Sequence, residues 1–469
     1  MANDWQIATI DKVAEKVGMG PFGSSIKVET FVPEGIPVIS GQHLHGFRLD
    51  ETPGFNFISP EHADKLKNAN VQKGDIILTH RGNIGQVSFI PSNSRYERYV
   101  ISQSQFYVRC DRHHIIPEFI VYYFKSPEGQ HKLLANAAQV GVPSIAQPVT
   151  YLRSLDIPIP PLSEQRAIAH ILGTLDDKIE LNRQMNEILE AIARTIFKSW
   201  FVDFDPVIDN ALRAGNLIPS LLTEKAARCR GMLARAKSEG RESCFPKHIA
   251  AYFPDHFMDS DLGPIPAGWR VVSLPDVVDI NPPRILKKGE VAPYLDMANM
   301  PTRCHMPDVV IERSFGSGMR FINGDTLVAR ITPCLENGKT AYIDFLADGQ
   351  VGWGSTEYIV LRPKPPLPSE LGYCLARSTE FREFAIQSMT GTSGRQRVPP
   401  AALFHYLLVR PSELILQQFG IVVQPLFSKA SQVARESCTL AALRNTLLPK
   451  LISGELRVKH VERFIEKDV

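Results

Sequence analysis

Long apolar runs are missing from this 469-residue sequence, and their absence excludes one class of protein. A helix that crosses a bilayer needs about 20 consecutive apolar residues, and no stretch of the chain approaches that length. Residues 1–5 also lack the basic start and the following apolar segment of a secretory signal peptide. We therefore expect a cytoplasmic protein without a membrane segment.

Paired cysteines are missing as well. The seven cysteines are scattered, and none has the Cys-x-x-Cys spacing typical of zinc sites; they are Cys110, Cys229, Cys244, Cys304, Cys334, Cys374 and Cys438. A metal centre or a disulfide framework is not expected, and reduced thiols are the simpler interpretation.

An excess of positive charge is also missing, since 52 Lys and Arg residues face 50 Asp and Glu residues. Net charge alone therefore does not identify a nucleic-acid-binding protein. A duplex-binding protein of this composition needs a localised basic face, or partner subunits that supply further phosphate contacts.

Motifs for catalysis and cofactor binding are incomplete. Residues 18–23 read Gly-x-Gly-x-x-Gly, but Pro21 lies inside the motif and no helical pattern follows, so a loop is favoured over a dinucleotide site. Asn281-Pro282-Pro283 resembles the start of an adenine-methyltransferase loop, but Arg284 replaces the aromatic residue that stacks on an extruded base. We expect no catalytic residue, no cofactor and no metal ion on this chain.

An internal repeat is the most informative feature. A Gly-Asp turn before an apolar strand occurs at residues 73–78 and again at 323–328, and residues 104–109 resemble residues 356–361 in the same order. A Trp-led strand pattern also begins each half, and the halves differ most in their early parts. This predicts two related modules with a common scaffold and different ligand-contacting loops.

Each half ends in a long amphipathic pattern, over residues 163–200 and from Ser412 to an end between Pro449 and Gly454. Ser163 and Ser412 are suitable N-caps, and Pro425 is expected to kink the second helix. Such lengths exceed those of most globular helices, so the two helices are expected to pair as a coiled coil. The buried stripe of the first is expected to contain Ile168, Ile171, Leu172, Leu175, Ile179, Met185, Leu189, Ile192, Ile196 and Trp200.

Taken together, these segments resemble the specificity subunits of type I restriction–modification systems, over the whole chain and in the right order. One departure is at residues 411–418, where the proline–glutamine string of the first half is degenerate. The strings that carry the resemblance are GPFGSSIK at 20–27, EGIPVISGQHL at 34–44, PPLSEQRAIAHILGTLDDKIELNRQMNEILEAIARTIFKSWFVDF at 160–204, LGPIPAGWRVVSL at 262–274 and LLPKLISGELRV at 447–458.

The resemblance implies an α+β fold, with two similar target recognition domains separated by two long antiparallel helices that form a coiled coil with a pseudo-twofold axis. It implies double-stranded DNA as the ligand, with each domain reading half of a bipartite target. The implied divisions are recognition domain 1 (1–158), a central helix (159–204), a linker and junction (205–263), recognition domain 2 (264–410), a C-terminal helix (411–454) and a tail (455–469).

The resemblance also implies partner subunits. Two methyltransferase subunits would dock on the helices and methylate adenine with S-adenosylmethionine, and restriction subunits that use ATP and Mg²⁺ would join when DNA is cut. The residues expected on the partner-binding helices are Gln165, Arg166, Ile168, Leu172, Leu175, Leu189, Trp200, Leu443, Leu447 and Leu451.

Candidate DNA contacts are the loop residues whose side chains can read base edges or bind phosphates. In the first module they are Ser40, Gln42, His43, His80, Arg81, Asn83, Ser102, Gln103 and Gln105. In the second they are Arg284, Lys287, Lys288, Arg303, Arg330, Thr332, Ser355, Thr392, Ser393, Arg395 and Arg397.

Two alternatives remain open at this point. The chain could be a fused or degenerate adenine-N6 methyltransferase built around Asn281, or a coiled-coil scaffold that binds only proteins.

Overall fold

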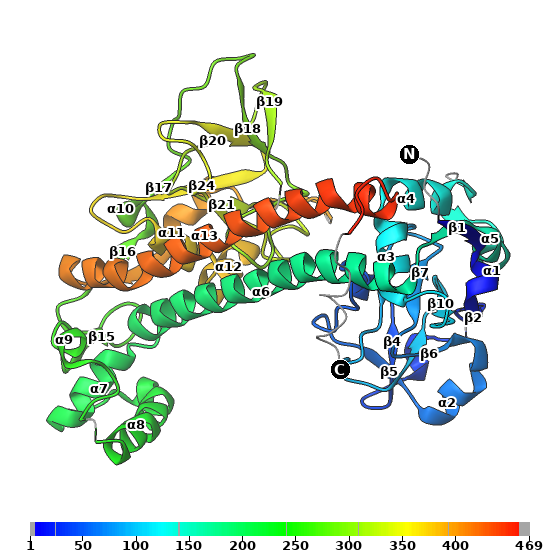
Figure 1. The fold of residues 1–469 in the computed structure, drawn as a ribbon. Helices are drawn as coiled ribbons and strands as arrows, with labels where there is room; N and C mark the ends of the chain where they lie inside the picture. Colours follow the sequence, from blue (N-terminus) through cyan, green and yellow to red (C-terminus); the bar gives the residue numbers. More distant parts are fainter. Residues whose placement is uncertain are drawn as a thin grey trace. The chain divides into compact units, whose positions relative to one another are not determined.

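The chain divides into two compact units, each of which contains one of the two repeated modules and part of both long helices (Figure 1). Unit 1 comprises residues 1–180 and 439–469, and unit 2 comprises residues 181–438. The fold is mixed, with helices and mostly antiparallel sheets, as expected. The computed structural model describes residues 5–23, 25–138, 141–240, 242–307, 309–392 and 394–458.

Unit 1 is built on a four-stranded sheet of order β2-β10-β7-β8 and a five-stranded sheet of order β3-β5-β4-β9-β6, with the short pairs β1-β13 and β11-β12. The strands are β1 Gln6–Thr9, β2 Ala14–Met19, β3 Phe31–Val32, β4 Ile36–Ile39, β5 Asn56–Ile58, β6 Asn70–Gln72, β7 Ile76–Thr79, β8 Val87–Phe89, β9 Arg98–Ile101, β10 Gln105–Cys110, β11 Ala137–Ala138, β12 Ser144–Ile145 and β13 Asp156–Ile159. The helices are α1 Ile10–Val13, α2 Pro60–Lys65, α3 Pro117–Lys125, α4 Pro127–Leu134 and α5 Pro148–Ser154.

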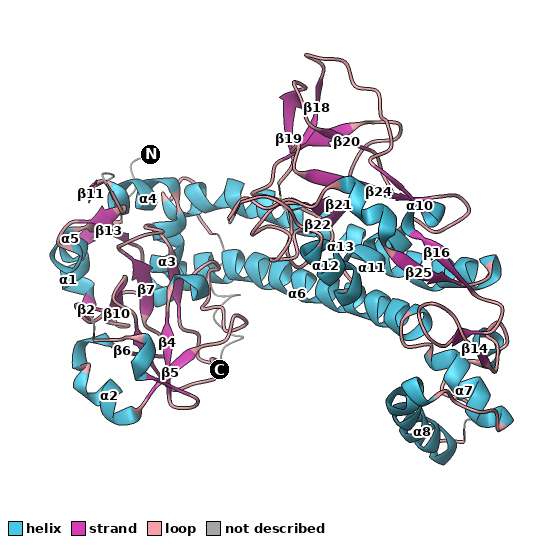
Figure 2. Cartoon of the chain, turned by 180° about the vertical axis from the view of Figure 1, so that it is seen from behind, coloured by secondary structure: helices cyan, strands magenta, loops and turns pink. Residues whose placement is uncertain are grey.

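Unit 2 contains the sheets β17-β24-β21-β22 and β19-β18-β23-β20, with the pairs β16-β25 and β14-β15 (Figure 2). Its strands are β14 Phe257–Met258, β15 Ile265–Pro266, β16 Arg270–Ser273, β17 Val278–Ile280, β18 Val291–Leu295, β19 Ile311–Ser314, β20 Met319–Phe321, β21 Thr326–Ala329, β22 Thr340–Tyr342, β23 Gly352–Gly354, β24 Tyr358–Pro363 and β25 Leu407–Arg410. Its shorter helices are α7 Asp205–Ala214, α8 Thr223–Ser238, α9 Lys247–Ala250, α10 Leu274–Val277, α11 Glu370–Ala376 and α12 Thr379–Gln387.

The internal repeat is visible in the strand register. Leu78 pairs with Phe106 in unit 1, and Val328 pairs with Ile359 in unit 2. Both modules also contain one parallel pair in the second sheet, β4 with β9 and β18 with β23. The sequence match of residues 104–109 with 356–361 was therefore wrong by one residue, because Phe106 corresponds to Ile359. In a short strand made almost entirely of apolar residues, alignments that differ by one residue look alike, so the sequence does not determine the register.

The Gly-Asp turns form the same structure in both modules. Gly74 and Gly324 have φ angles of 89° and 86°, a region in which only glycine is unstrained. In unit 1 the buried Asp75 carboxylate accepts hydrogen bonds from the Gln72 backbone N–H (2.8 Å) and from Nε and Nη2 of Arg109 (2.8 and 2.7 Å). This two-point ion pair holds the start of β7 against β10.

In unit 2 the corresponding Asp325 is fully buried and accepts from the Ile322 backbone N–H (2.9 Å), Nη2 of Arg284 (3.0 Å) and Nη1 of Arg362 (3.3 Å). Burial raises the pKa of this carboxyl, and the two arginines oppose that shift. Arg284 was expected to contact DNA, but here it neutralises a buried carboxylate.

The two long helices are α6, Leu162–Phe201, and α13, Glu413–Ile452. In unit 1, Asp176 pairs with Arg444 (2.5 Å) and Glu164 with Arg457 (2.9 Å), so the two segments run antiparallel there. In unit 2, Asn182 of α6 donates to Glu436 of α13 (3.0 Å). Among the described residues, no helix is long and apolar enough to span a membrane.

One expectation about the helical segments needs correction. α6 begins one residue before Ser163, so this serine is not its N-cap. Pro425 lies within the continuous helix α13, and the expected kink there stays a prediction. Residues 205–263, the predicted linker and junction, contain α7, α8 and α9. Asp209 of α7 organises this segment because it is buried and accepts from the Ser243 hydroxyl (2.7 Å) and the Cys244 backbone N–H (3.2 Å).

A buried histidine joins the second module to both long helices within unit 2. The backbone N–H and Nδ1 of His305 donate to Oε1 of Glu190 on α6 (2.6 and 2.9 Å), and its Nε2 donates to Asp344 (3.1 Å). Ser431 of α13 donates to the same Asp344 carboxylate, and Tyr373 of α11 donates to Glu190 (2.7 Å). Burial by itself lowers the pKa of His305, but the hydrogen bonds and charges of Asp344 and Glu190 raise it to about 9.

The stability of unit 2 should therefore depend on pH through His305. Its folded-state pKa of about 9 lies above the ordinary value of 6.5, so its stabilisation is complete below pH 6.5 and is lost as pH rises through about 9. His305→Gln should lower the free energy of unfolding by about 3–5 kcal/mol at low pH, because it leaves two buried carboxylates without their cation.

Denaturant midpoints of the wild type and His305→Gln at about pH 6, 7.5 and 9 would measure this effect. The difference between the two proteins should shrink as pH rises, whereas exposed His248→Gln should match the wild type throughout. A difference between wild type and His305→Gln that stays constant over this range would contradict the assignment.

Candidate nucleic-acid interface

Both modules share an arrangement that we name the platform, which we define as three chain segments at the end of the paired central strands. In unit 1 the platform comprises residues 80–83, 102–104 and 143–145, and in unit 2 it comprises residues 330–332, 355–357, 390–392 and 394–397.

Three backbone hydrogen bonds hold the platform of unit 2 together. The Arg330 N–H donates to the Glu357 carbonyl (3.0 Å), the Val398 N–H donates to the Arg330 carbonyl (2.8 Å), and the Thr332 N–H donates to the Gln396 carbonyl (3.1 Å). Arg397 also forms single antiparallel β-bridges with residues 331 and 390. The segments are thus fixed by the backbone, whatever side chains they carry.

The platform of unit 1 has the same three bonds. The His80 N–H donates to the Ser104 carbonyl (2.9 Å), the Ile145 N–H donates to the His80 carbonyl (2.9 Å), and the Gly82 N–H donates to the Pro143 carbonyl (2.9 Å). Arg330 therefore corresponds to His80 and not to Arg81, whose place in unit 2 is taken by an isoleucine. The shared frame carries different side chains in the two units.

Five predicted DNA contacts of unit 1 belong to this platform, namely His80, Arg81, Asn83, Ser102 and Gln103. Arg81 is exposed beside the bridge to Ser144, as is Asn83 in the same loop. His80 is buried and donates Nε2 to the Gln103 carbonyl (3.1 Å); burial lowers its pKa. Gln105 is also buried and accepts from the Ser102 hydroxyl. His80 and Gln105 therefore stabilise the platform from its buried side.

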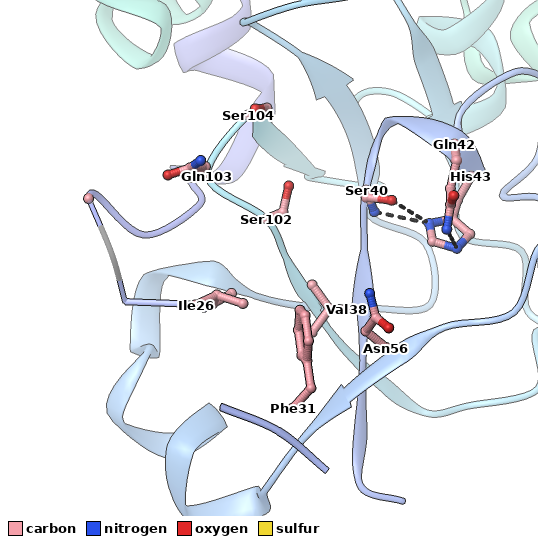
Figure 3. A pocket seen from close by; sticks show the side chains of 11 residues that line it. Ile26, Phe31, Val38, Ser40, Gln42, His43, Asn56, Ser102, Gln103 and Ser104 are labelled. Atoms are coloured by element: carbon pink, nitrogen blue, oxygen red, sulfur yellow. Dashed lines mark hydrogen bonds between the residues drawn. The ribbon is translucent and has the colours of Figure 1, made fainter. Parts of the chain in front are cut away.

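A cavity of about 190 Å³ adjoins the platform of unit 1 (Figure 3). Ser102, Gln103 and Ser104 line one side, the turn of Ser40, Gln42 and His43 lines another, and the remaining lining comes from Gly23, Ile26, Phe31, Val38 and Asn56. His43 is buried, with Nδ1 accepting from the Ser40 N–H (3.0 Å), Nε2 donating to the Gly54 carbonyl (2.8 Å) and its ring stacked on Phe55. It therefore holds this turn, and Gln42 is exposed beside it.

In unit 2 the structure brings most of the predicted DNA contacts together. Arg330, Thr332, Ser355, Thr392, Arg395 and Arg397 all belong to the platform, and Ser393 lies outside the described residues. Lys287 and Lys288 are exposed in the connection between β17 and β18, and Arg303 is exposed in the segment between β18 and β19.

Sequence reasoning missed Glu357, which lies between two of these arginines. Its carboxylate accepts from Nε of Arg330 (3.2 Å) and from Nε of Arg397 (2.9 Å). Glutamate was not among the residue types considered as DNA contacts, and no sequence signal marks Glu357, because the two arginines that it bonds are 27 and 40 residues away along the chain.

Half of the residues expected to bind partners are buried in the cores of their own units. Gln165, Ile168, Leu172 and Leu451 are buried in unit 1, and Trp200 is buried in unit 2. Gln165 illustrates why, since its amide bonds the Ile116 N–H (2.9 Å) and the Pro160 carbonyl (2.8 Å). These five are not available to a partner. Leu175, Leu189 and Leu447 are half-buried, and Arg166 and Leu443 are exposed.

A different face of α6 is exposed and apolar in unit 2. We name Leu181, Met185, Ile188 and Ile192 the outer stripe; their exposed fractions are 55%, 42%, 56% and 43%. The expectation that Met185 and Ile192 belong to the buried stripe was therefore wrong. The face opposite is polar and buried, with Asn182, Asn186 and Glu190 facing inward. This inverted polarity is typical of a helix that is covered by another chain.

Neither incomplete motif forms a site of the kind it resembles. β2 ends at Met19, and the next described helical turn is the 3₁₀ turn Val28–Thr30, so no helix N-terminus follows the glycines. Asn281 has a φ of 53°, and its side-chain oxygen accepts from the Val360 N–H (2.9 Å). Among the described residues, no group of three or more His, Cys, Asp or Glu side chains is placed to hold a metal ion.

Comparison with known proteins gives a consistent result. Residues 2–191 match the model of the type I restriction modification DNA specificity domain. The chain is 25% identical to the type I restriction enzyme MjaIX specificity subunit of Methanocaldococcus jannaschii, over 98% of this chain and 95% of that protein. It is 24% identical to the HindI specificity subunit of Haemophilus influenzae, over 82% of this chain and 87% of that protein.

Among solved structures, the S subunit of a type I restriction–modification system from M. genitalium aligns with a TM-score of 0.49 and 17% identity. The alignment covers 96% of this chain and 97% of that one.

Proposed function

We propose that this chain, a member of the type I restriction–modification specificity-subunit family, reads the two halves of a bipartite DNA sequence with its two platforms. The observation that carries the proposal is that one backbone frame occurs twice with different side chains. Base edges are distinguished by the donors and acceptors that a protein presents in the groove. Two equal frames with different donors suit two different half-sites.

The platform chemistry supports DNA as the ligand. Exposed Arg81 and Asn83 in unit 1, and Arg395 with half-buried Arg330 and Arg397 in unit 2, supply the donors used for guanine, adenine and phosphate. Because the whole chain carries a net charge of only +2, these local clusters must provide most of its own attraction to phosphates.

The methyltransferase alternative is disfavoured by Asn281. In that chemistry the loop amide must be available to the extruded base. Here the amide oxygen is bonded to the Val360 N–H (2.9 Å), and the Asn281 N–H is bonded to the Val360 carbonyl (2.7 Å), which joins β17 to β24. We infer that this chain contributes recognition and that catalysis belongs to its partners.

The proposed partners are two methyltransferase subunits, joined by restriction subunits when DNA is cut. The outer stripe supports this proposal because its apolar residues recur at spacings of four, three and four, the pattern that an amphipathic helix covers. We propose that a helix of the methyltransferase subunit packs there. S-adenosylmethionine, ATP and Mg²⁺ then bind to the partner subunits, and the assembly acts on DNA in the cytoplasm.

Two measurements test the function. The chain assembled with its methyltransferase subunits should protect two separated segments of duplex DNA in a footprint. The chain alone, mixed with DNA and labelled S-adenosylmethionine, should transfer no label, whereas the assembly should label adenine. Transfer by the chain alone would favour the enzyme alternative, and an assembly without a DNA footprint would favour the protein-only scaffold.

Arg81→Ala should weaken recognition of the half-site read by unit 1. If Arg81 makes a bidentate base contact, the loss is about 1–3 kcal/mol on the target and disappears when that base pair is changed. Equilibrium binding of the assembly to target and single-substitution duplexes measures it. The control Lys12→Ala removes an exposed charge just before β2, at the end of that strand away from the platform, and should have little effect on binding. An Arg81→Ala curve that overlays the wild type would exclude this contact.

Ile188→Glu in the outer stripe should weaken association with the methyltransferase subunit by at least about tenfold, because the new carboxylate would be buried without a partner. The chain's own stability should change by less than about 0.5 kcal/mol, since Ile188 is exposed. Titration calorimetry of the two subunits gives the affinity. Gln424→Glu adds the same charge at an exposed position of α13 and serves as control. Equal affinities for both variants would rule out the stripe as a docking surface.

A further inference from the structure

The Glu357 carboxylate accepts hydrogen bonds from two arginines of the unit 2 platform, and in both arginines the donor is Nε. Nε of Arg330 donates to Oε2 (3.2 Å), and Nε of Arg397 donates to Oε1 and Oε2 (2.9 and 3.0 Å). Because Nε lies at the inner edge of the planar guanidinium, its engagement leaves the outer Nη atoms on the opposite side. The glutamate thus determines which edge each arginine presents.

The exposure of the three side chains agrees with this orientation. Glu357 is 22% exposed, Arg330 26% and Arg397 42%, so the acceptor lies deepest and the arginines extend outward from it. One Nη of Arg397 is also held by the Arg395 carbonyl (3.2 Å). The backbone frame described above fixes the three residues independently of their side chains.

The equivalent positions of unit 1 carry different chemistry. Ser104 occupies the place of Glu357, His80 that of Arg330 and Ser144 that of Arg397, as the shared hydrogen bonds and bridges establish. The pair of arginines with its glutamate therefore distinguishes the second platform from the first, and its effect should be confined to one half-site.

We propose that Glu357 is a positioning residue that presents the Nη edges of Arg330 and Arg397 to guanine in the half-site read by unit 2. A guanidinium edge matches O6 and N7 of guanine, and fixing that edge in advance reduces the entropy lost on binding. This inference rests on the proposed function and adds a base and a residue role to it. A negative charge at a DNA interface repels phosphate, and its pairing with two arginines fits such a positioning role.

The test uses the chain assembled with its methyltransferase subunits. The wild-type target is first selected from a pool of randomised duplex DNA, and each G·C pair of the second half-site is then replaced in turn. Discrimination is the ratio of the affinities for the intact and replaced duplexes. The variants are Glu357→Ala, Glu357→Gln, which keeps one acceptor oxygen, and the control Glu383→Ala, which removes an exposed carboxylate on α12.

Glu357→Ala should reduce discrimination at one G·C pair of the second half-site by about 5- to 150-fold, the range expected for one bidentate contact. Discrimination at the first half-site should be unchanged, and affinity for unrelated duplex should stay equal or rise, because one negative charge has been removed. Glu357→Gln should give an intermediate loss, and Glu383→Ala should match the wild type.

Several results would overturn the inference. These are unchanged discrimination in Glu357→Ala, equal losses at both half-sites, an equal loss on all sequences as for a phosphate contact, or a selected second half-site without a G·C pair. A wild-type assembly that discriminates no sequence would contradict the proposed function itself. Normal discrimination by both the wild type and Glu357→Ala would contradict this inference alone.

Discussion

The hydrogen bond between the end of one buried strand and the turn before its partner is the constraint on which both platforms depend. It joins His80 to Ser104 in unit 1 and Arg330 to Glu357 in unit 2. The strands behind it, β7 with β10 and β21 with β24, are buried almost throughout, so a slip of one residue would expose apolar side chains and bury polar ones. The position of each platform is therefore set by the core, while the platform side chains are not needed to fold it. A recognition protein can change its target on such a frame without losing its fold.

A second constraint within unit 2 is the polarity of α6, whose buried face is polar and whose exposed face is apolar. Asn182, Asn186 and Glu190 face inward, whereas the outer stripe faces solvent. Buried polar groups of this kind stabilise less than apolar packing but favour one register of a helix pair. The network of Glu190, His305 and Asp344 extends this register to the second recognition module. The unit thus combines a polar, buried contact between its helices with an exposed apolar stripe on the outer face of α6.

The sequence allowed the larger features to be predicted because they depend on local patterns. The mixed fold, the two long helices and the repeated Gly-Asp turn follow from periodicity and from the backbone requirements of glycine. The features that failed depend on tertiary contacts. The register of residues 104–109 was misplaced by one because apolar strands look alike at neighbouring offsets. Met185 and Ile192 were assigned to the core because residue type alone does not reveal whether an apolar side chain faces the core or the solvent.

The candidate site shows the same limit. Residue type identified Arg330, Arg395 and Arg397 as possible DNA contacts, but it could not separate them from Arg284, whose partner Asp325 is distant in sequence and adjacent in space. Glu357 was not found, since its role depends on the two arginines beside it. The predicted domain boundaries and the individual DNA contacts stay predictions.

The central claim is that the two platforms read two half-sites independently, and an exchange of one module tests it most directly. Residues 1–158 would be replaced by the corresponding part of another specificity subunit, and the hybrid would be expressed with its methyltransferase subunits. Methylated adenines would then be mapped across the genomic DNA of the host. The account predicts that one half of the methylated sequence changes to that of the donor while the other half remains. A simultaneous change in both halves, or methylation of the original sequence, would contradict it.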